Sequence, residues 1–253
     1  MKYFIFGLFS MLLLSQCSPV YVPNTRNAPL LSKAGEFQTA MQFGTNGLDL
    51  QAAVAVTNNL AVMGNYSYGN RNTDTLYDNS NKENFHKHKF YEGAIGYYRN
   101  DDMFCFEIFL GYGRGEGTSY GHYSLFSTSE DRFVTGKYDR YFIQPSFGIK
   151  KKFISVAFTP RFSMVDFSEF SASSSSTPET VNLEPKMFVE PAVTARFNFL
   201  DNRFFASIQI GVSTPLADNV IFDYEPFNVS TGLGFRLGGL RWKKKDETTK
   251  SDQ

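Results

Sequence analysis

A strict alternation of apolar and polar residues runs through this chain from Glu36 onward, and it limits the fold more than any other feature. Between Phe153 and Met164, for example, apolar residues alternate with Ser155, Thr159 and Arg161. Successive side chains of a β-strand point to opposite faces, so this period predicts strands with one apolar face. Beyond the apolar N-terminus, no stretch has a helical period. The sequence therefore predicts an all-β protein.

The alternating segments are long. The pattern predicts about ten strands of about nine to fourteen residues each. Strands of soluble proteins average about five or six residues, whereas a tilted strand needs about nine to eleven to cross a bilayer. The lengths therefore favour a membrane barrel over a soluble sandwich. The strands are expected at 36–44, 47–57, 59–69, 88–99, 103–114, 136–149, 153–165, 186–199, 203–213 and 226–237.

The connections alternate between short and long after the second expected strand. Short turns fall near Asn58, Asp101, Lys151 and Asn202. Outer-membrane barrels have short periplasmic turns, longer outer loops and an even number of strands. The sequence thus predicts that both ends of the barrel lie on the periplasmic side. The long polar loops are expected at 70–87, 115–135, 166–185 and 214–225, and the glycines of 111–117 are expected to loosen the second of them.

The N-terminus has the features of a secretory signal. Lys2 is followed by an apolar run from Tyr3 to Leu14 that is too short to span a bilayer. Cys17 follows directly, which resembles the lipobox of bacterial lipoproteins, although Gln16 replaces the usual small residue before the cysteine. The resemblance implies that residues 1–16 are removed and that Cys17 carries a covalent lipid, such as palmitate. A plain secretory signal with an incidental cysteine is the alternative.

Together these features resemble a small outer-membrane β-barrel protein with a lipoprotein-type signal, a combination similar to proteins of Bacteroidota. The closing strand FNVSTGLGFRLGG carries the likeness, although a charged tail follows it. The resemblance implies a closed antiparallel transmembrane barrel of about ten strands in the cell outer membrane, with its lipid anchor on the periplasmic side. The expected parts are a signal peptide at 1–16, a periplasmic linker at 17–35, the barrel at 36–240 and a charged periplasmic tail at 241–253.

Composition excludes some classes of function. The 25 Lys and Arg residues balance the 25 Asp and Glu residues, so nothing favours nucleic-acid binding. The chain has two cysteines, Cys17 and Cys105, so lipidation of the first leaves the second without a disulfide partner. We expect no cofactor other than the lipid. The expected partners are outer-membrane lipids and other outer-membrane or periplasmic proteins.

If the apolar faces meet lipid, the opposite faces line the lumen and carry charges of both signs. Unpaired buried charges are costly, so these should pair across the barrel. About eight strands are filled by their own side chains, and open channels appear near sixteen. Ten strands therefore predict a plugged or very narrow lumen. The expected lumen charge network is Glu92, Glu107, Arg140, Arg161, Glu190, Arg196 and Arg236.

The sequence gives little support for catalysis or metal binding. His86 and His88 would share a face of a strand, but no further ligand completes a metal site, so they are interpreted as solvated loop residues. Polar loops contain acidic residues and histidines by chance, so their presence on the expected outer loops does not indicate an active site. The sequence has no nucleophile motif such as Gly-x-Ser-x-Gly. We expect no catalytic residues and no metal ligands. The residues considered for an outer-rim enzyme are Asp74, Asp78, Asp131, His86, His122 and Asp223.

These observations predict a non-enzymatic outer-membrane β-barrel lipoprotein that is a structural or accessory component of an envelope complex. Two alternatives remain open at this stage. One is a narrow pore that transports small solutes. The other is a periplasmic lipid-anchored protein with a lipocalin-like core that binds an apolar ligand.

Overall fold

The computed structural model of the chain describes residues 19–73, 84–101, 103–125, 128–174, 179–180, 182–217 and 220–238. The expected signal peptide at 1–16, the expected acyl acceptor Cys17 and the expected tail at 241–253 lie outside the described residues. Among the described residues, no helix is long and apolar enough to cross a membrane.

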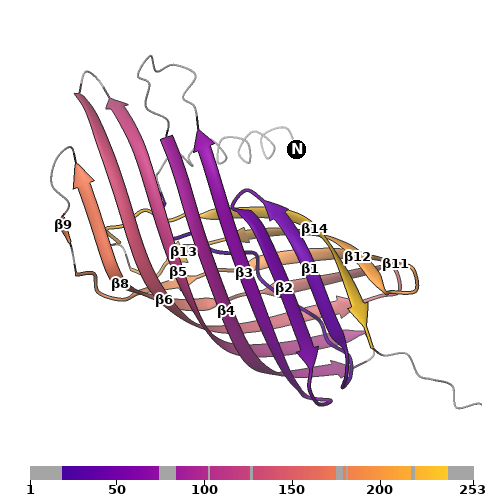
Figure 1. The fold of residues 1–253 in the computed structure, drawn as a ribbon. Helices are drawn as coiled ribbons and strands as arrows, with labels where there is room; N and C mark the ends of the chain where they lie inside the picture. Colours follow the sequence, from indigo (N-terminus) through magenta and orange to yellow (C-terminus); the bar gives the residue numbers. More distant parts are fainter. Residues whose placement is uncertain are drawn as a thin grey trace, which may run out of the picture.

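The described residues form a closed antiparallel β-barrel (Figure 1). Three of its crossings are interrupted, between β7 and β8, β10 and β11, and β12 and β13, so the described segments make ten crossings. Pairing of β1 with β14 closes the barrel. The expected fold class and strand count are confirmed. The segments are β1 (Phe37–Gly44), β2 (Gly47–Ala55), β3 (Leu60–Thr73), β4 (Asn84–Asp101), β5 (Phe104–Leu125), β6 (Thr128–Lys150), β7 (Ile154–Thr159), β8 (Phe162–Ser174), β9 (Glu179–Thr180), β10 (Lys186–Val189), β11 (Ala192–Phe199), β12 (Phe204–Val212), β13 (Thr214–Pro215) and β14 (Phe227–Leu237).

The alternation in sequence becomes an apolar outside and a polar inside. On β4, Tyr91, Ile95 and Tyr97 point outward and are exposed, whereas Glu92 and Tyr98 point inward and are buried. Such an outward apolar band suits contact with lipid. A lipocalin-like protein would need the reverse, with an apolar interior and a polar exterior. The burial pattern therefore argues against that alternative and gives the chain the fold of an outer-membrane barrel.

The long-loop end differs from the sequence expectation, because strands extend into three of the expected loops, including 166–185, where β8 continues to Ser174. Strand β5 continues to Leu125 and β6 begins at Thr128, so most of the loop expected at 115–135 is paired backbone. Likewise β3 and β4 extend well into the stretch expected as the loop 70–87. Figure 1 shows these hairpins projecting beyond β1, β2 and β14. Gly, Ser and Thr in these segments hid the strand period.

Three prolines form a row across neighbouring crossings. The registers of β6 with β7 and β8 place Pro145 opposite Pro160, and those of β7 with β11 and β8 with β10 place Pro160 opposite Pro191. Proline has no backbone N–H, so each removes a donor from the sheet ladder. Two of the three interruptions, at residues 160–161 and 190–191, fall in this row.

A polar residue in the outward band should weaken the barrel. Ile95 is 68 % exposed and faces the surrounding lipid. We expect Ile95→Thr to lower the free energy of unfolding by about 1 kcal/mol, because the side chain loses two carbon atoms that contact lipid. Urea unfolding in lipid vesicles measures the effect. Lys87→Thr, on the outward face of the same strand but already polar, should change nothing, and equal losses in both variants would contradict a lipid-facing Ile95.

The linker expected at 17–35 is the main error of the sequence interpretation. Every residue from 19 to 31 is buried, and the segment runs inside the barrel (Figure 1). It is therefore not a periplasmic linker. The physical reason is that ten strands enclose a lumen too wide to be filled by the inward side chains alone, and residues 19–31 occupy the remaining space.

Candidate functional site: the N-terminal segment in the lumen

We call residues 19–31 the lumen segment. Its first residues lie at the long-loop end, where the Val20 amide donates to the Asp223 carbonyl oxygen (2.9 Å) and the Tyr21 carbonyl accepts from the Glu225 amide (3.0 Å). Its last residues lie at the short-turn end, where the Lys150 ammonium donates to the Leu30 carbonyl oxygen (3.1 Å). The segment thus crosses the whole lumen before β1 begins.

Lumen side chains take the place of a neighbouring strand for this segment. A buried backbone needs partners for its N–H and C=O groups. Gln209 supplies both kinds, since its Oε1 accepts from the Arg26 amide (2.7 Å) and its Nε2 donates to the Arg26 carbonyl (2.8 Å). Gln51 donates to the Thr25 carbonyl (2.9 Å) and Gln144 to the Asn27 carbonyl (2.7 Å). Glutamines that point inward from three different crossings therefore bond to the backbone of residues 25–27, in place of the backbone of a neighbouring strand.

Asn24 lies at the centre of a buried charge cluster. Its Oδ1 accepts from Arg140 Nη2 (2.7 Å) and Arg161 Nη1 (2.9 Å), and its Nδ2 donates to Glu92 Oε1 (3.0 Å). Both arginines also pair with the Glu92 carboxylate, and the three charged side chains are fully buried. The cluster joins β4, β6 and the β7–β8 junction through one residue of the lumen segment.

Glu190 supplies a second negative charge beside this cluster. Its carboxylate accepts from the Tyr21 hydroxyl (2.6 Å), the Ser163 hydroxyl (2.9 Å) and the Ser213 hydroxyl (3.2 Å). Arg140 also donates to the Tyr21 hydroxyl (3.3 Å). Along the wall, Glu92 on β4 and Glu190 at the β10–β11 junction therefore flank Arg140 and Arg161. The buried charges are thus compensated and hydrogen-bonded.

Arg26 compensates for a proline of the wall. Val212 donates its amide to the Pro191 carbonyl (2.9 Å), but Pro191 has no N–H to return the bond. Arg26 Nη2 donates to the Val212 carbonyl oxygen instead (3.1 Å), while its Nη1 donates to the Asn24 carbonyl (3.0 Å). The lumen segment therefore provides a donor that the barrel wall lacks.

Removing this donor should destabilise the barrel. We expect Arg26→Met, which keeps the length and bulk of the side chain, to lower the free energy of unfolding by roughly 1 to 2 kcal/mol, because it leaves a buried carbonyl without a donor. Denaturant unfolding in vesicles measures the change. Ser230→Ala removes a buried lumen hydroxyl that has no partner among the described residues, so it should be neutral. An unaltered Arg26→Met protein would contradict the role of Arg26.

Aromatic residues close the lumen above the charges. Tyr21 packs against the rings of Tyr138 and Phe188, with centroids 5.3 and 5.0 Å away. The Arg140 guanidinium lies 4.0 Å from the Phe90 ring centroid. This contact joins the buried charge cluster to a cluster of buried apolar side chains. The cluster occupies the long-loop end of the lumen and consists of Val20, Tyr21, Phe90, Val134, Tyr138, Val165, Phe167, Phe170, Phe188 and Phe222.

Alternate glycines on the inner face of β5 make room for this packing. A Cβ atom at Gly115 would lie 2.4 Å from the Tyr138 ring, and one at Gly117 would lie 2.2 Å from the Val20 carbonyl oxygen. The glycines of 111–117 therefore do not loosen a loop, as the sequence interpretation held. They belong to a strand and admit the rings and the lumen segment.

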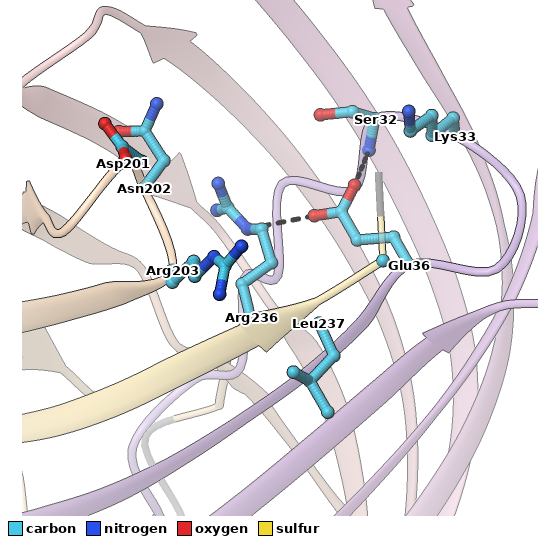
Figure 2. Close-up of a pocket in the computed structure, with 9 residues that line it drawn as sticks. Ser32, Lys33, Glu36, Asp201, Asn202, Arg203, Arg236 and Leu237 are labelled. Carbon is cyan, nitrogen blue, oxygen red and sulfur yellow. Dashed lines mark hydrogen bonds and ion pairs between the residues drawn. The ribbon is translucent and has the colours of Figure 1, made fainter. Parts of the chain in front are cut away.

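The remaining members of the expected network lie toward the short-turn end. Glu107 Oε1 accepts from the Leu31 amide (2.8 Å), and Arg196 Nη1 donates to the Pro29 carbonyl (3.0 Å). Arg236 pairs with Glu36 (2.9 Å) beside a cavity of about 280 Å³ (Figure 2). The structure thus brings Glu92, Arg140 and Arg161 into direct contact and holds Glu190, Glu107 and Arg196 through the lumen segment. Arg236 connects to Arg196 through Glu36 and Gln38, because Gln38 donates to Glu36 (2.8 Å) and accepts from Arg196 (3.3 Å).

His86 and His88 do not lie in a solvated loop. They stack on strand β4 with ring centroids 5.2 Å apart, and His88 is buried. His86 borders a cavity of about 190 Å³ together with Arg71 and Glu225, and burial raises the pKa of the Glu225 carboxyl. Among the described residues, no group of three potential metal ligands occurs.

Among the residues considered for an outer-rim enzyme, His122 and Asp131 have backbones directly opposite each other in the register of β5 with β6. Asp74 and Asp78 lie outside the described residues, and the side chains of His122 and Asp131 are not described either. Asp223 contributes its backbone carbonyl to the lumen segment. No catalytic grouping forms from these residues in the described part of the chain.

Sequence reasoning assigned the lumen-facing side chains but missed their main partner. The signal was present in Val20-Tyr-Val-Pro and Ala28-Pro-Leu-Leu, where apolar residues and prolines flank the polar Asn24-Thr-Arg-Asn. A solvated linker does not require this composition. The four alternate glycines of 111–117, all on one face of an extended strand, also indicated that something bulky lies against them.

Comparison with solved structures finds other β-barrels, whereas the comparisons of sequence find no match. No protein-family model and no curated protein matches the sequence. Among solved structures, the chain is similar to the translocator domain of the autotransporter NalP from Neisseria meningitidis, with 10 % identity, a TM-score of 0.45 and coverage of 80 % of this chain and 86 % of that one. It is also similar to the outer membrane protease OmpT from Escherichia coli, with 10 % identity, a TM-score of 0.48 and coverage of 81 % and 94 %. At this level of similarity, neither protein's activity transfers to this chain, whose own strand pairing establishes the outer-membrane β-barrel fold.

Proposed function

We propose that this protein is a non-enzymatic outer-membrane lipoprotein whose barrel is permanently closed by its own N-terminal segment. In this proposal the signal peptide is removed, Cys17 carries the lipid, and the barrel acts as a structural or accessory component of an envelope complex. Its partners are membrane lipids and envelope proteins rather than nucleic acid, and it needs no cofactor besides the lipid.

The observation that carries the proposal is the burial of residues 19–31 across the full length of the lumen. A transport barrel keeps a continuous water path, whereas here Asn24, Arg140 and Arg161 meet at mid-lumen and Tyr21 with Phe188 cover them. The lumen side chains are committed to holding the segment, so little is left inside the barrel to handle a solute. The remaining surfaces are the lipid-facing wall and the projecting hairpins.

The test is electrical. The purified full-length protein in planar bilayers should show no current steps over a wide voltage range. Stable ohmic steps from the wild type would overturn the closed-barrel proposal and favour the narrow-pore alternative.

The accessory role has a separate test. Mild extraction of the tagged protein from its native membrane should recover another envelope protein in a fixed ratio. Recovery of the barrel alone, at every detergent tried, would contradict the accessory role without affecting the closed barrel.

A further inference from the structure

The direction of the lumen segment bears on where the lipid of the N-terminus lies. We propose that the acyl chains on Cys17 enter the outer leaflet, on the same side as the projecting hairpins, rather than the periplasmic leaflet. The inference rests on the lipidation of Cys17 proposed above. It reverses the sidedness that the sequence favoured.

The first step is the height of Val20 in the barrel. The Val20 carbonyl oxygen lies against Gly117 of β5, within 2.2 Å of where a Cβ would stand. Gly117 is thirteen residues along β5 from Phe104 at the short-turn end. With roughly 3.3 Å per residue and a strand tilt of about 40°, it stands about 33 Å above that end. The apolar band of such barrels is about 25 Å tall, so Val20 lies roughly 8 Å beyond its outer edge, on the side of the long loops.

A second set of contacts independently places the segment's first residues at this end. The Val20 and Tyr21 backbones bond to Asp223 and Glu225, which belong to the long connection between β13 and β14. Asn46, in the turn between β1 and β2 at the same end, donates to the Pro23 carbonyl (3.0 Å). Two connections on the long-loop side therefore contact the first residues of the segment.

The reach of the chain excludes the other leaflet. Three residues separate Cys17 from Val20, and an extended chain spans at most about 3.6 Å per residue, or roughly 11 Å in all. A return to the periplasmic leaflet would have to cover about three times that distance. The lumen beside the segment is also filled, by Tyr138, Phe90 and Arg140. Cys17 therefore reaches the outer mouth and its rim but not the inner leaflet.

The outer surface of the wall just below Val20 suits acyl chains, at the level of residues 112–114 of β5. Tyr91, Tyr112 and Tyr141 lie on neighbouring strands and point outward, with 42 to 52 % of each side chain exposed. Aromatic side chains of this kind mark the lipid–water interface of a membrane barrel. A chain that leaves the lumen over this rim would place its lipid beside the barrel, and the protein would be anchored at the cell surface by both lipid and strands.

The experiment uses the full-length protein in intact cells of a host that lipidates it. Ser18→Cys introduces a thiol next to the acyl acceptor, and a maleimide on a polymer too large to cross the outer membrane is the probe. Lys151→Cys, in the exposed turn between β6 and β7, is the matched control for the periplasmic side. Glu116→Cys, exposed on the outward face of β5 next to Gly117, is the control for the outer side.

We expect Ser18→Cys to be labelled in intact cells to the same extent as Glu116→Cys, while Lys151→Cys reacts only after permeabilisation. Labelling of Ser18→Cys only after permeabilisation, or only after unfolding in SDS, would overturn the proposal. Incorporation of an alkynyl palmitate, measured on the same samples and absent from Cys17→Ser, reports the lipid itself. Labelling from outside without palmitate would mean that the lipoprotein proposal fails although the direction of the segment is right.

Discussion

Glu92→Gln should lower the free energy of unfolding of the barrel by about 3 to 5 kcal/mol, the cost of leaving buried charges without their partner. Glu92 is the carboxylate that both Arg140 and Arg161 contact, and all three side chains are fully buried. Glutamine keeps the shape and one acceptor oxygen for Asn24, so the change isolates the charge. Denaturant unfolding in lipid vesicles, followed by the heat-dependent shift in gel mobility, measures the loss.

Glu116→Gln is the matched control for this substitution. Glu116 lies on the outward face of β5 and is exposed, so the same chemical change there should alter stability by less than about 0.5 kcal/mol. Similar effects of Glu92→Gln and Glu116→Gln would show that water or other groups compensate the two arginines. The buried cluster would then not be the centre of the closed lumen.

Gly117→Val should displace the outer end of the lumen segment and open the seal. The added Cβ would stand 2.2 Å from the Val20 carbonyl oxygen and 3.0 Å from its carbonyl carbon. Because backbone rather than a flexible side chain opposes it, the clash cannot be relieved by a rotamer change. We expect a destabilisation near the upper end of the roughly 1 to 3 kcal/mol typical of overpacking, together with current steps in planar bilayers that the wild type lacks.

The same substitution on the other side of the wall separates packing from strand propensity. Gly93 points outward, and the nearest atom to a Cβ there is the Met63 carbonyl oxygen at 3.9 Å. Gly93→Val should therefore leave both stability and electrical silence unchanged. If Gly117→Val also stays silent and stable, the lumen segment does not seal the barrel at Val20.

Most of the barrel could be predicted because it depends on a local rule. The side chains of successive residues, such as Ile154 and Ser155, point to opposite faces of the sheet. The sequence of each strand therefore shows which residues face inward and which face outward. The placement of Glu92, Arg140 and Arg161 inside followed from the same rule. Their shared contact with Asn24 did not, because it joins positions 68 to 137 residues apart through a segment without any period.

The limits of the strands were harder to predict than their faces. Strand β5 loses its apolar alternation beyond Tyr112, where glycines face inward and small polar residues follow. The backbone pairing of Gly117 with Gly136, and of Thr118 with Thr135, continues the sheet without that signal. The prolines at 145, 160 and 191 were visible in the sequence, but only the register shows that they stand side by side.

The position of the lumen segment constrains the order of events during assembly. Residues 24–27 bond to Asp49 of β2, to Arg140 of β6 and to Gln209 of β12, so they touch wall on both sides of the seam between β1 and β14. A chain with lipid on its first residue would not pass through a lumen of this width once the wall is complete. In the lipoprotein proposed above, the sheet would therefore curl around a segment that is already in place, and pairing of β14 with β1 would be the last event. The N-terminal residues then act as an internal template on which the barrel is built.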